Sequence, residues 1–408
     1  MISRRMRLCA LCALLPLLLA MRPVDETLLT AAMDGHLPQI KKLVEQGADV
    51  RAANAQGTTP LHAAAWNGHR DVVTFLLRKG APVNHVTSDG ATPLYIAAQN
   101  GRSEVAALLL NNGASVNLST KQGVTPIFIA AQNGYRDIVA LLLRHHADAN
   151  QPAEDGVTPL FMAAQRGHDM VVELLLDHGA TMNLTLADGS TPLFVAAQNG
   201  HVPTVSLLVG KGAAVNQAMR DGATPLLVAA QNGHRAIVEL LLEHGARINQ
   251  TVQNGVTPLH VAAQNGHREV VALLLKQKAA INQQARNRAT PLFLAVQNNH
   301  RDVATLLLEK GALVNQSTPD GATPLHIATA AGYREMAALL LKKGAAINAQ
   351  TADGKTPLHL GAYHGNREIV SLLLKHGGNK QAKTLSGERP LDLARQQGHR
   401  ALFALLKT

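Results

Sequence analysis

The sequence predicts an all-α solenoid in which one small helical unit is repeated along almost the whole chain. Each 33-residue step holds two stretches of apolar residues at helical spacing, separated by glycine. The chain is 46% hydrophobic but only 3% aromatic, which favours thin layers of Leu, Val, Ile and Ala over one large interior. We therefore expect twelve stacked units, the first and last of them atypical. The steps are marked, without insertion or deletion, by Pro60, Pro93, Pro126, Pro159, Pro192, Pro225, Pro258, Pro291, Pro324, Pro357 and Pro390.

Each unit is predicted to contain two short helices and a turn. Thr59 can cap the first helix, and Pro60 suits its first position. Gly68 then ends this helix in the left-handed conformation. The second helix carries an acid in its first turn and Val and Leu at helical spacing, and it closes at Gly80. A polar turn over 84–90 leads into the next unit.

The Thr-Pro-Leu-His motif at 59–62 and the pair Gly68-His69 recur in this register, and together with the period they resemble the ankyrin repeat family over residues 25–408. The resemblance implies a hairpin-like turn between repeats and a concave groove, lined by turn tips and first helices, for a protein partner. With helices roughly 8–10 Å apart, twelve repeats imply a curved rod of about 100–120 Å. The expected organisation is a leader at 1–20, an N-terminal capping repeat at 21–57, ten internal repeats at 58–387 and a C-terminal capping repeat at 388–408.

Residues 1–20 have the pattern of an export signal. Arg4, Arg5 and Arg7 precede an apolar run over 8–20, as in secretory signal peptides. The run is too short to span a bilayer, Pro16 interrupts it, and no later stretch is apolar for long enough. We predict a cleaved leader and an exported chain, either periplasmic or secreted. The alternative is a cytoplasmic protein whose translation starts at Met21.

The residue types argue against catalysis. The two cysteines, Cys9 and Cys12, both lie in the predicted leader, so disulfides, cysteine zinc sites and a cysteine nucleophile are excluded from the rest. The glycines are singletons at repeat positions rather than a phosphate loop, and no zinc signature or separate Ser/His/Asp set stands out. We predict a monomeric protein that is not an enzyme and takes no cofactor, metal or small-molecule substrate.

An aromatic side chain recurs at one position of the first helix. Two residues after the repeat proline, several repeats carry His, whereas middle repeats carry Tyr95, Phe128, Phe161, Phe194 and Phe293. One hypothesis is an apolar stripe that anchors a partner, because aromatic residues are common interface anchors. The alternative is that the ring replaces His in packing between repeats.

A Gln-Asn pair recurs at the end of the first helix. Similarity to ankyrin repeats implies that these positions touch the partner, so their repetition would suit a periodic ligand read once per repeat. The alternative is recent duplication, with the amides bonding the helix ends. The pairs are Gln99-Asn100, Gln132-Asn133, Gln198-Asn199, Gln231-Asn232, Gln264-Asn265 and Gln297-Asn298.

The net charge of +10 is concentrated at the two ends. Residues 1–20 contribute three cations, 21–339 sum to zero, and 340–408 carry eleven basic and four acidic side chains. A basic end can bind nucleic acid or anionic lipid, but no nucleic-acid module is present and a capping repeat needs charge for solubility. Our leading hypothesis is a protein-binding scaffold or adaptor. The alternative is attachment to an anionic surface or polymer through a basic end that includes Lys342, Lys343, Lys375, Lys380 and Lys383.

Four glycosylation sequons begin at one turn position, at Asn117, Asn183, Asn249 and Asn315. The family resemblance implies that this asparagine bonds the turn, so we interpret the sequons as a by-product of the repeat.

Three expected glycines are replaced close together, by Lys278, Arg288 and Asn299. Asn tolerates the left-handed conformation, whereas Lys and Arg there should cost about 1 kcal/mol each. We predict a weak point or hinge over 276–299.

Overall fold

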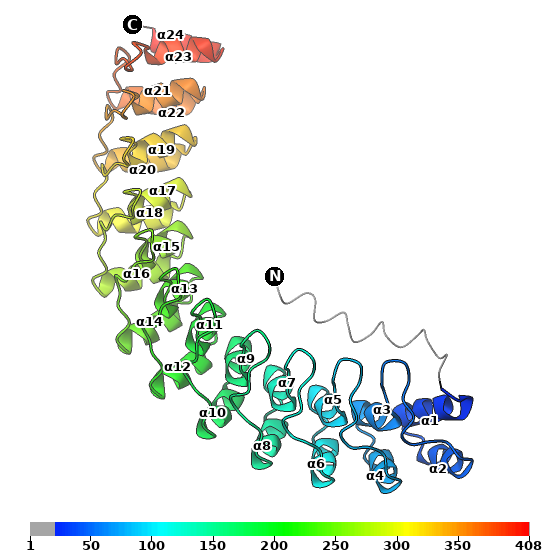
Figure 1. The fold of residues 1–408 in the computed structure, drawn as a ribbon. Helices are drawn as coiled ribbons and strands as arrows, with labels where there is room; N and C mark the ends of the chain where they lie inside the picture. Colours follow the sequence, from blue (N-terminus) through cyan, green and yellow to red (C-terminus); the bar gives the residue numbers. More distant parts are fainter. Residues whose placement is uncertain (1–20, 408) are drawn as a thin grey trace. The chain divides into compact units, whose positions relative to one another are not determined.

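The computed structural model describes residues 21–407, and in this part of the chain it holds twenty-four α-helices, one short 3-10 helix and no strand. The leader predicted at 1–20 lies outside the described residues. The chain divides into two compact bodies, one ending at Ala187 and the other beginning at Asp188. Within each body, the odd-numbered helices pack side by side in one layer and the even-numbered helices in another (Figure 1). This arrangement confirms the all-α repeat prediction.

The helices alternate between first and second helices of the repeats. The N-terminal body holds α1 (Pro23–Asp34), α2 (Leu37–Glu45), α3 (Pro60–Asn67), α4 (Arg70–Arg78), α5 (Pro93–Gln99), α6 (Ser103–Asn111), α7 (Pro126–Gln132), α8 (Arg136–Arg144), α9 (Pro159–Arg166) and α10 (Asp169–Asp177). The C-terminal body holds α11 (Pro192–Gln198), α12 (Val202–Gly210), α13 (Pro225–Gln231), α14 (Arg235–Glu243), α15 (Pro258–Gln264), α16 (Arg268–Lys276), α17 (Pro291–Gln297), α18 (Arg301–Glu309), α19 (Pro324–Ala330), α20 (Arg334–Lys342), α21 (Pro357–Tyr363), α22 (Arg367–Lys375), α23 (Pro390–Gln396), η2 (Arg400–Leu402) and α24 (Phe403–Leu406).

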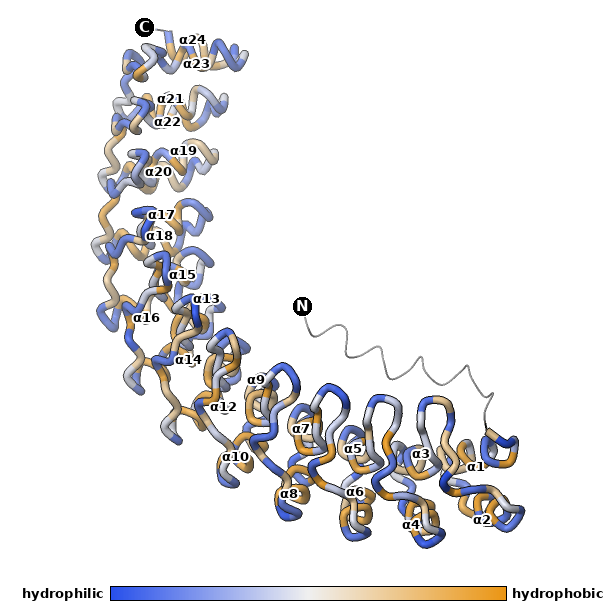
Figure 2. The backbone as a smooth tube through the Cα atoms, in the orientation of Figure 1, coloured by the Kyte–Doolittle hydropathy of each residue, from blue (hydrophilic) through white to orange (hydrophobic). Residues whose placement is uncertain are grey.

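The first helices are short because their ends are fixed by sequence. In α11, the Thr191 hydroxyl accepts a hydrogen bond from the Phe194 N–H at 3.1 Å, and proline holds the first position. The second helices are amphipathic and bury one apolar side each, such as Val72 and Leu76 in α4. Figure 2 shows the hydrophobic residues mainly on the helices and the polar residues in the turns. Among residues 21–407, no helix is long and apolar enough to span a bilayer.

A histidine links each of several repeats to the repeat before it. The His234 Nε2–H donates to the Gln198 carbonyl at 3.1 Å. The ring lies against Gly200, where an added Cβ would come within 2.8 Å of it, and Gly200 has φ of 80°. Glycine therefore serves both the turn and the close contact. The same bond, at 2.9–3.1 Å to a carbonyl 36 residues earlier, is made by His69, His168, His267, His300 and His399.

The turn asparagines also link neighbouring repeats. The Asn315 side chain accepts from the Ala346 N–H at 2.8 Å and donates to the Gly344 carbonyl at 3.3 Å. Asn117 and Asn249 likewise accept backbone N–H bonds from a residue 31 positions later. The predicted role of this position in the turn is confirmed at three of the four sequons.

Four residues other than glycine have a left-handed backbone in the described chain. Lys278, Arg288 and Asn299 have φ of 64°, 58° and 57°, as expected from the missing glycines. His146, with φ of 62°, was not anticipated. It stands 33 residues, or one repeat, after Gly113, so the repeat pattern could have predicted a left-handed residue at this position.

Backbone bonds join the turn tips, meaning the turns that precede each repeat threonine. In the C-terminal body the N–H of the second tip residue donates to the carbonyl of the third residue of the preceding tip. These bonds are Arg220 to Asp188 (2.9 Å), Gln253 to Asp221 (3.0 Å), Arg286 to Asn254 (2.8 Å), Ala352 to Asp320 (2.7 Å) and Leu385 to Asp353 (2.9 Å).

One junction between turn tips in this series lacks the backbone hydrogen bond. Pro319 has no N–H, so the Asn287 carbonyl receives no corresponding bond. Arg288 stands where the next repeat has Gly321, at which a Cβ would lie 2.9 Å from the following turn. A cavity of about 420 Å³ adjoins this junction, lined by Arg288 and residues 313–317. The predicted weak point therefore coincides with a missing link between turn tips.

We predict faster amide hydrogen exchange over 276–299 than over 243–266, the matching segment one repeat earlier. The physical reason is that 243–266 has glycine at all three left-handed positions, whereas 276–299 has none. Equal protection of the two segments would contradict the weak point.

The variant Arg288→Gly should raise the free energy of unfolding by about 1 kcal/mol, because it removes a Cβ from a left-handed backbone. Denaturant unfolding measures the gain. The matched control is Asn299→Gly, which should gain less because Asn tolerates this conformation. A larger gain from the control would show that backbone strain is not the cause.

Candidate functional site

The predicted aromatic stripe lies inside the molecule. Phe128, Phe161, Phe194 and Phe293 are only 5–7% exposed. Tyr95 is half-buried, and burial raises the pKa of its hydroxyl to about 12. The four phenylalanines therefore offer no anchoring surface in this structure, which favours the alternative that the rings pack between repeats.

Histidine fills the same position in other repeats and makes polar bonds there. His260 Nδ1 accepts from the Thr257 N–H at 3.2 Å and from the Thr257 hydroxyl at 2.7 Å. Its Nε2–H donates to the Ala289 carbonyl at 3.2 Å in the next repeat. Because Nδ1 accepts a backbone N–H, the neutral ring is the form that fits.

Burial keeps these histidines neutral. It lowers the pKa of His62 and of His260 to about 4 each, since neither charged ring would have water around it. Burial also lowers the pKa of His326 and His359. These four rings are structural parts of the first helices. In the described chain, no three His, Cys, Asp or Glu side chains gather as metal ligands would.

The asparagines of the Gln-Asn pairs are engaged within the fold. Their Nδ2 groups donate to carbonyls at the end of a first helix, either in their own repeat or in the preceding one. The bonds run from Asn100 to Ile96 (2.8 Å), Asn133 to Gln99 (3.1 Å), Asn199 to Val195 (2.8 Å), Asn232 to Gln198 (2.8 Å), Asn265 to Val261 (2.9 Å) and Asn298 to Leu294 (2.9 Å). For asparagine, the structure thus supports the helix-end alternative.

The glutamines of the same pairs differ from the asparagines. Gln198, Gln231, Gln264 and Gln297 are exposed, and their carboxamides make no hydrogen bond within residues 21–407. Gln99 and Gln132, in the N-terminal body, are half-buried. We call the four exposed residues of the C-terminal body the glutamine row.

The backbone beneath the glutamine row is fixed. The carbonyls of Gln198, Gln231 and Gln264 accept from the histidines of the following repeats at 2.9–3.1 Å. Each glutamine ends a first helix whose other residues are largely buried. The row therefore presents identical donors and acceptors from a rigid layer. Sequence reasoning could find these positions but could not separate them from the adjacent asparagines.

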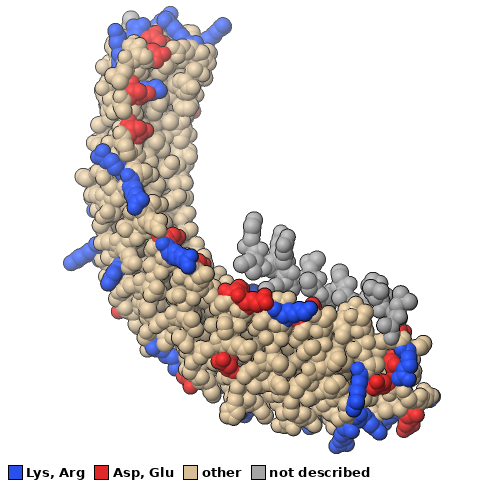
Figure 3. All heavy atoms as spheres, in the orientation of Figure 1, with Lys and Arg blue, Asp and Glu red and all other residues tan. Residues whose placement is uncertain are grey.

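The basic end is partly neutralised by its own contacts. Figure 3 shows Lys and Arg gathered at the C-terminal end, with Asp and Glu among them. Lys342, Lys343, Lys375 and Lys383 are exposed, whereas Lys380 is half-buried.

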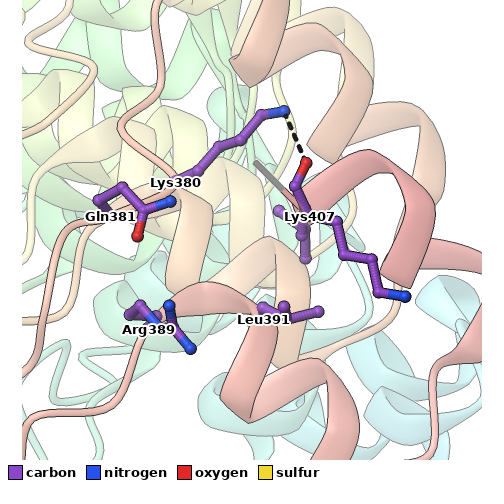
Figure 4. A pocket seen from close by; sticks show the side chains of 6 residues that line it. Lys380, Gln381, Arg389, Leu391 and Lys407 are labelled. Carbon is purple, nitrogen blue, oxygen red and sulfur yellow. Dashed lines mark hydrogen bonds between the residues drawn. The ribbon is translucent and has the colours of Figure 1, made fainter.

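A cavity of about 300 Å³ at this end is lined by Lys380, Gln381, Arg389, Leu391, Leu406 and Lys407. The Lys380 Nζ donates to the Lys407 carbonyl at 3.4 Å (Figure 4). Arg389 lies 3.1 Å from Asp392, and this ion pair lowers the pKa of the Asp392 carboxyl. Two cations of the cavity are thus already bound to groups of the chain, which leaves fewer for an anion.

A family model described as "Ankyrin repeats (3 copies)" matches the chain in overlapping segments at 28–120, 116–186, 172–252, 194–286, 259–351, 313–384 and 344–408. No curated protein matches the chain.

We predict that acid destabilises the fold through the buried histidines. Between pH 6.5 and about 4 the unfolded chain binds protons that folded His62 and His260 do not. Stability should therefore fall as the pH falls through this window, by up to about 1.4 kcal/mol per pH unit for each histidine. The measurement is denaturant unfolding at several pH values.

The chain supplies matched variants for this test, because phenylalanine fills the same position in other repeats. His62→Phe with His260→Phe should flatten the dependence on pH, and Phe161→His should steepen it. An unchanged slope in both variants would show that other groups cause the acid sensitivity.

Proposed function

Because the chain belongs to the ankyrin repeat family, we propose that it is a non-catalytic scaffold or adaptor that holds a protein partner against its first-helix layer. Ankyrin repeats are generally protein-interaction modules and typically lack catalysis. On such a scaffold the choice of partner depends on exposed side chains rather than on the fold.

The glutamine row is the observation that carries this proposal. At the other repeated polar positions of the first helix and the turns, many side chains serve the fold: Thr caps helices, His and Asn link repeats, and turn asparagines bond the next turn. The four glutamines are exposed and make no such bond within the described residues. Their repetition supports a binding surface formed by successive first helices.

A second candidate is attachment to an anionic surface or polymer through the basic end. It is favoured by the exposed Lys342, Lys343, Lys375 and Lys383. The internal bonds of Lys380 and Arg389 weigh against it. Binding of this kind should be lost near ~0.15 M salt, where charges are screened beyond about 8 Å.

The experiment that tests the leading proposal is site-specific photocrosslinking in the native cell. A crosslinking amino acid at Gln231 should capture one protein species at physiological salt. The same amino acid at Gln277, exposed at the end of α16 in the second-helix layer, is the matched control. Equal capture at both positions, or capture that requires Lys375 and Lys383, would contradict binding on the first-helix layer.

We further propose that the chain is exported and that residues 1–20 are removed. The basic start and the apolar run over 8–20 support this proposal. N-terminal sequencing of the protein from an extracytoplasmic fraction should then begin at or near Met21. A protein found only in the cytosol would contradict export and direct the search for partners to intracellular complexes.

A further inference from the structure

We propose that the glutamine row binds one extended polypeptide segment in the polyproline II conformation, with three of its residues aligned to each repeat. This inference rests on the proposed function and specifies its partner. The row is Gln198, Gln231, Gln264 and Gln297, all within the C-terminal body.

The row has a regular spacing. Its members end α11, α13, α15 and α17, which pack on one another in chain order (Figure 1). Packed helices lie about 8–10 Å apart, and equivalent residues on them repeat at that distance. A partner that makes the same contact with each glutamine must have a structure that repeats at the same distance.

Polyproline II fits this spacing better than the other regular conformations. It has three residues per turn and rises about 3.1 Å per residue, or about 9.3 Å per turn. In a β-strand, side chains on the same side recur every two residues, or about 6.7 Å. An α-helix repeats after about 5.4 Å. An α-helix also returns to the same side after two turns, about 10.8 Å, but its peptide groups are already bonded to one another. The three-residue period of polyproline II brings an unbonded peptide group to each successive glutamine.

The chemistry of the carboxamide matches that of the bound backbone. Gln offers both a donor and an acceptor, and polyproline II leaves its peptide groups without internal partners. The asparagine beside each glutamine has its side chain oriented by the fold, because its Nδ2 donates to a carbonyl of a first helix. The backbone at Gln198, Gln231 and Gln264 is held by His234, His267 and His300, so binding there orders side chains and not the main chain.

The charges around the row favour a neutral ligand. The adjoining turn tips carry Asp188 and Asp221 against Arg220, Arg286 and Arg288, a net formal charge of only +1. Nucleic acid would need a surplus of Lys and Arg along its backbone. The row therefore fits an uncharged polypeptide that is recognised through its main chain and tolerates changes in its side chains.

The test uses labelled peptides made of two, three, four or five Pro-Ala-Ser triplets and measures binding by fluorescence anisotropy. Affinity for the full-length protein should rise with each triplet up to four and then level off, because four glutamines contact the peptide. Each Gln→Ala change in the row should weaken binding about 3- to 10-fold, as loss of one hydrogen bond predicts. Gln277→Ala is the matched control and should leave affinity unchanged.

Three outcomes would overturn the inference: affinity independent of peptide length, binding unaffected when all four row glutamines are alanine, or equal binding of a flexible Gly-Ser peptide. Row-dependent binding of chito-oligosaccharide without peptide binding would assign the row to a glycan instead. Failure of all peptides while Gln231 still crosslinks a protein would overturn this inference alone. Peptide binding without any crosslinked protein would count against the scaffold proposal.

Discussion

The structure depends on the close approach of neighbouring first helices. Each first helix carries small residues at its centre, such as Ala196 and Ala197 in α11 and Ala229 and Ala230 in α13, and all four are fully buried. Larger side chains there would push the helices apart. Close approach allows a histidine of one repeat to reach a carbonyl of the repeat before it, and it brings successive turn tips within hydrogen-bonding distance. It also sets the distance at which an exposed residue recurs.

In a repeat protein, many polar side chains are used for hydrogen bonds between neighbouring repeats, because each repeat contacts the next in the same way. In the C-terminal body, threonine, histidine and asparagine are all used in this way. What remains exposed and without an internal partner at a repeated first-helix position is glutamine. A surface built from one neutral residue at a fixed interval suits a ligand that is itself regular. Specificity for such a ligand would come from its conformation and length.

The position after Thr-Pro-Leu shows how one site can hold two kinds of ring. Histidine there makes three hydrogen bonds and remains neutral because it is buried. Phenylalanine gives up these bonds but has no charged form, so it is indifferent to acid. In both cases the ring is inside the layer and the threonine hydroxyl still meets the backbone N–H at the third position. Phenylalanine at this position therefore fills the layer between repeats and makes the repeat less sensitive to acid.

The period, the two helices of each repeat, the threonine caps and the left-handed positions could all be predicted from the sequence, because they depend on contacts within one repeat or on backbone preferences. Lys278, Arg288 and Asn299 were identified in this way. Which repeated residues are buried, bonded or exposed became clear only from the folded repeats. The tertiary structure placed the four phenylalanines inside, bound the asparagines to carbonyls and left the glutamines exposed. It also paired Thr329 with Gly361, where an added Cβ would lie 3.4 Å from the threonine methyl. The burial of the rings, the bonds of Asn133 and Asn232 to the preceding repeat and the Thr329–Gly361 contact depend on residues about one repeat apart. A local pattern carries no information about such contacts.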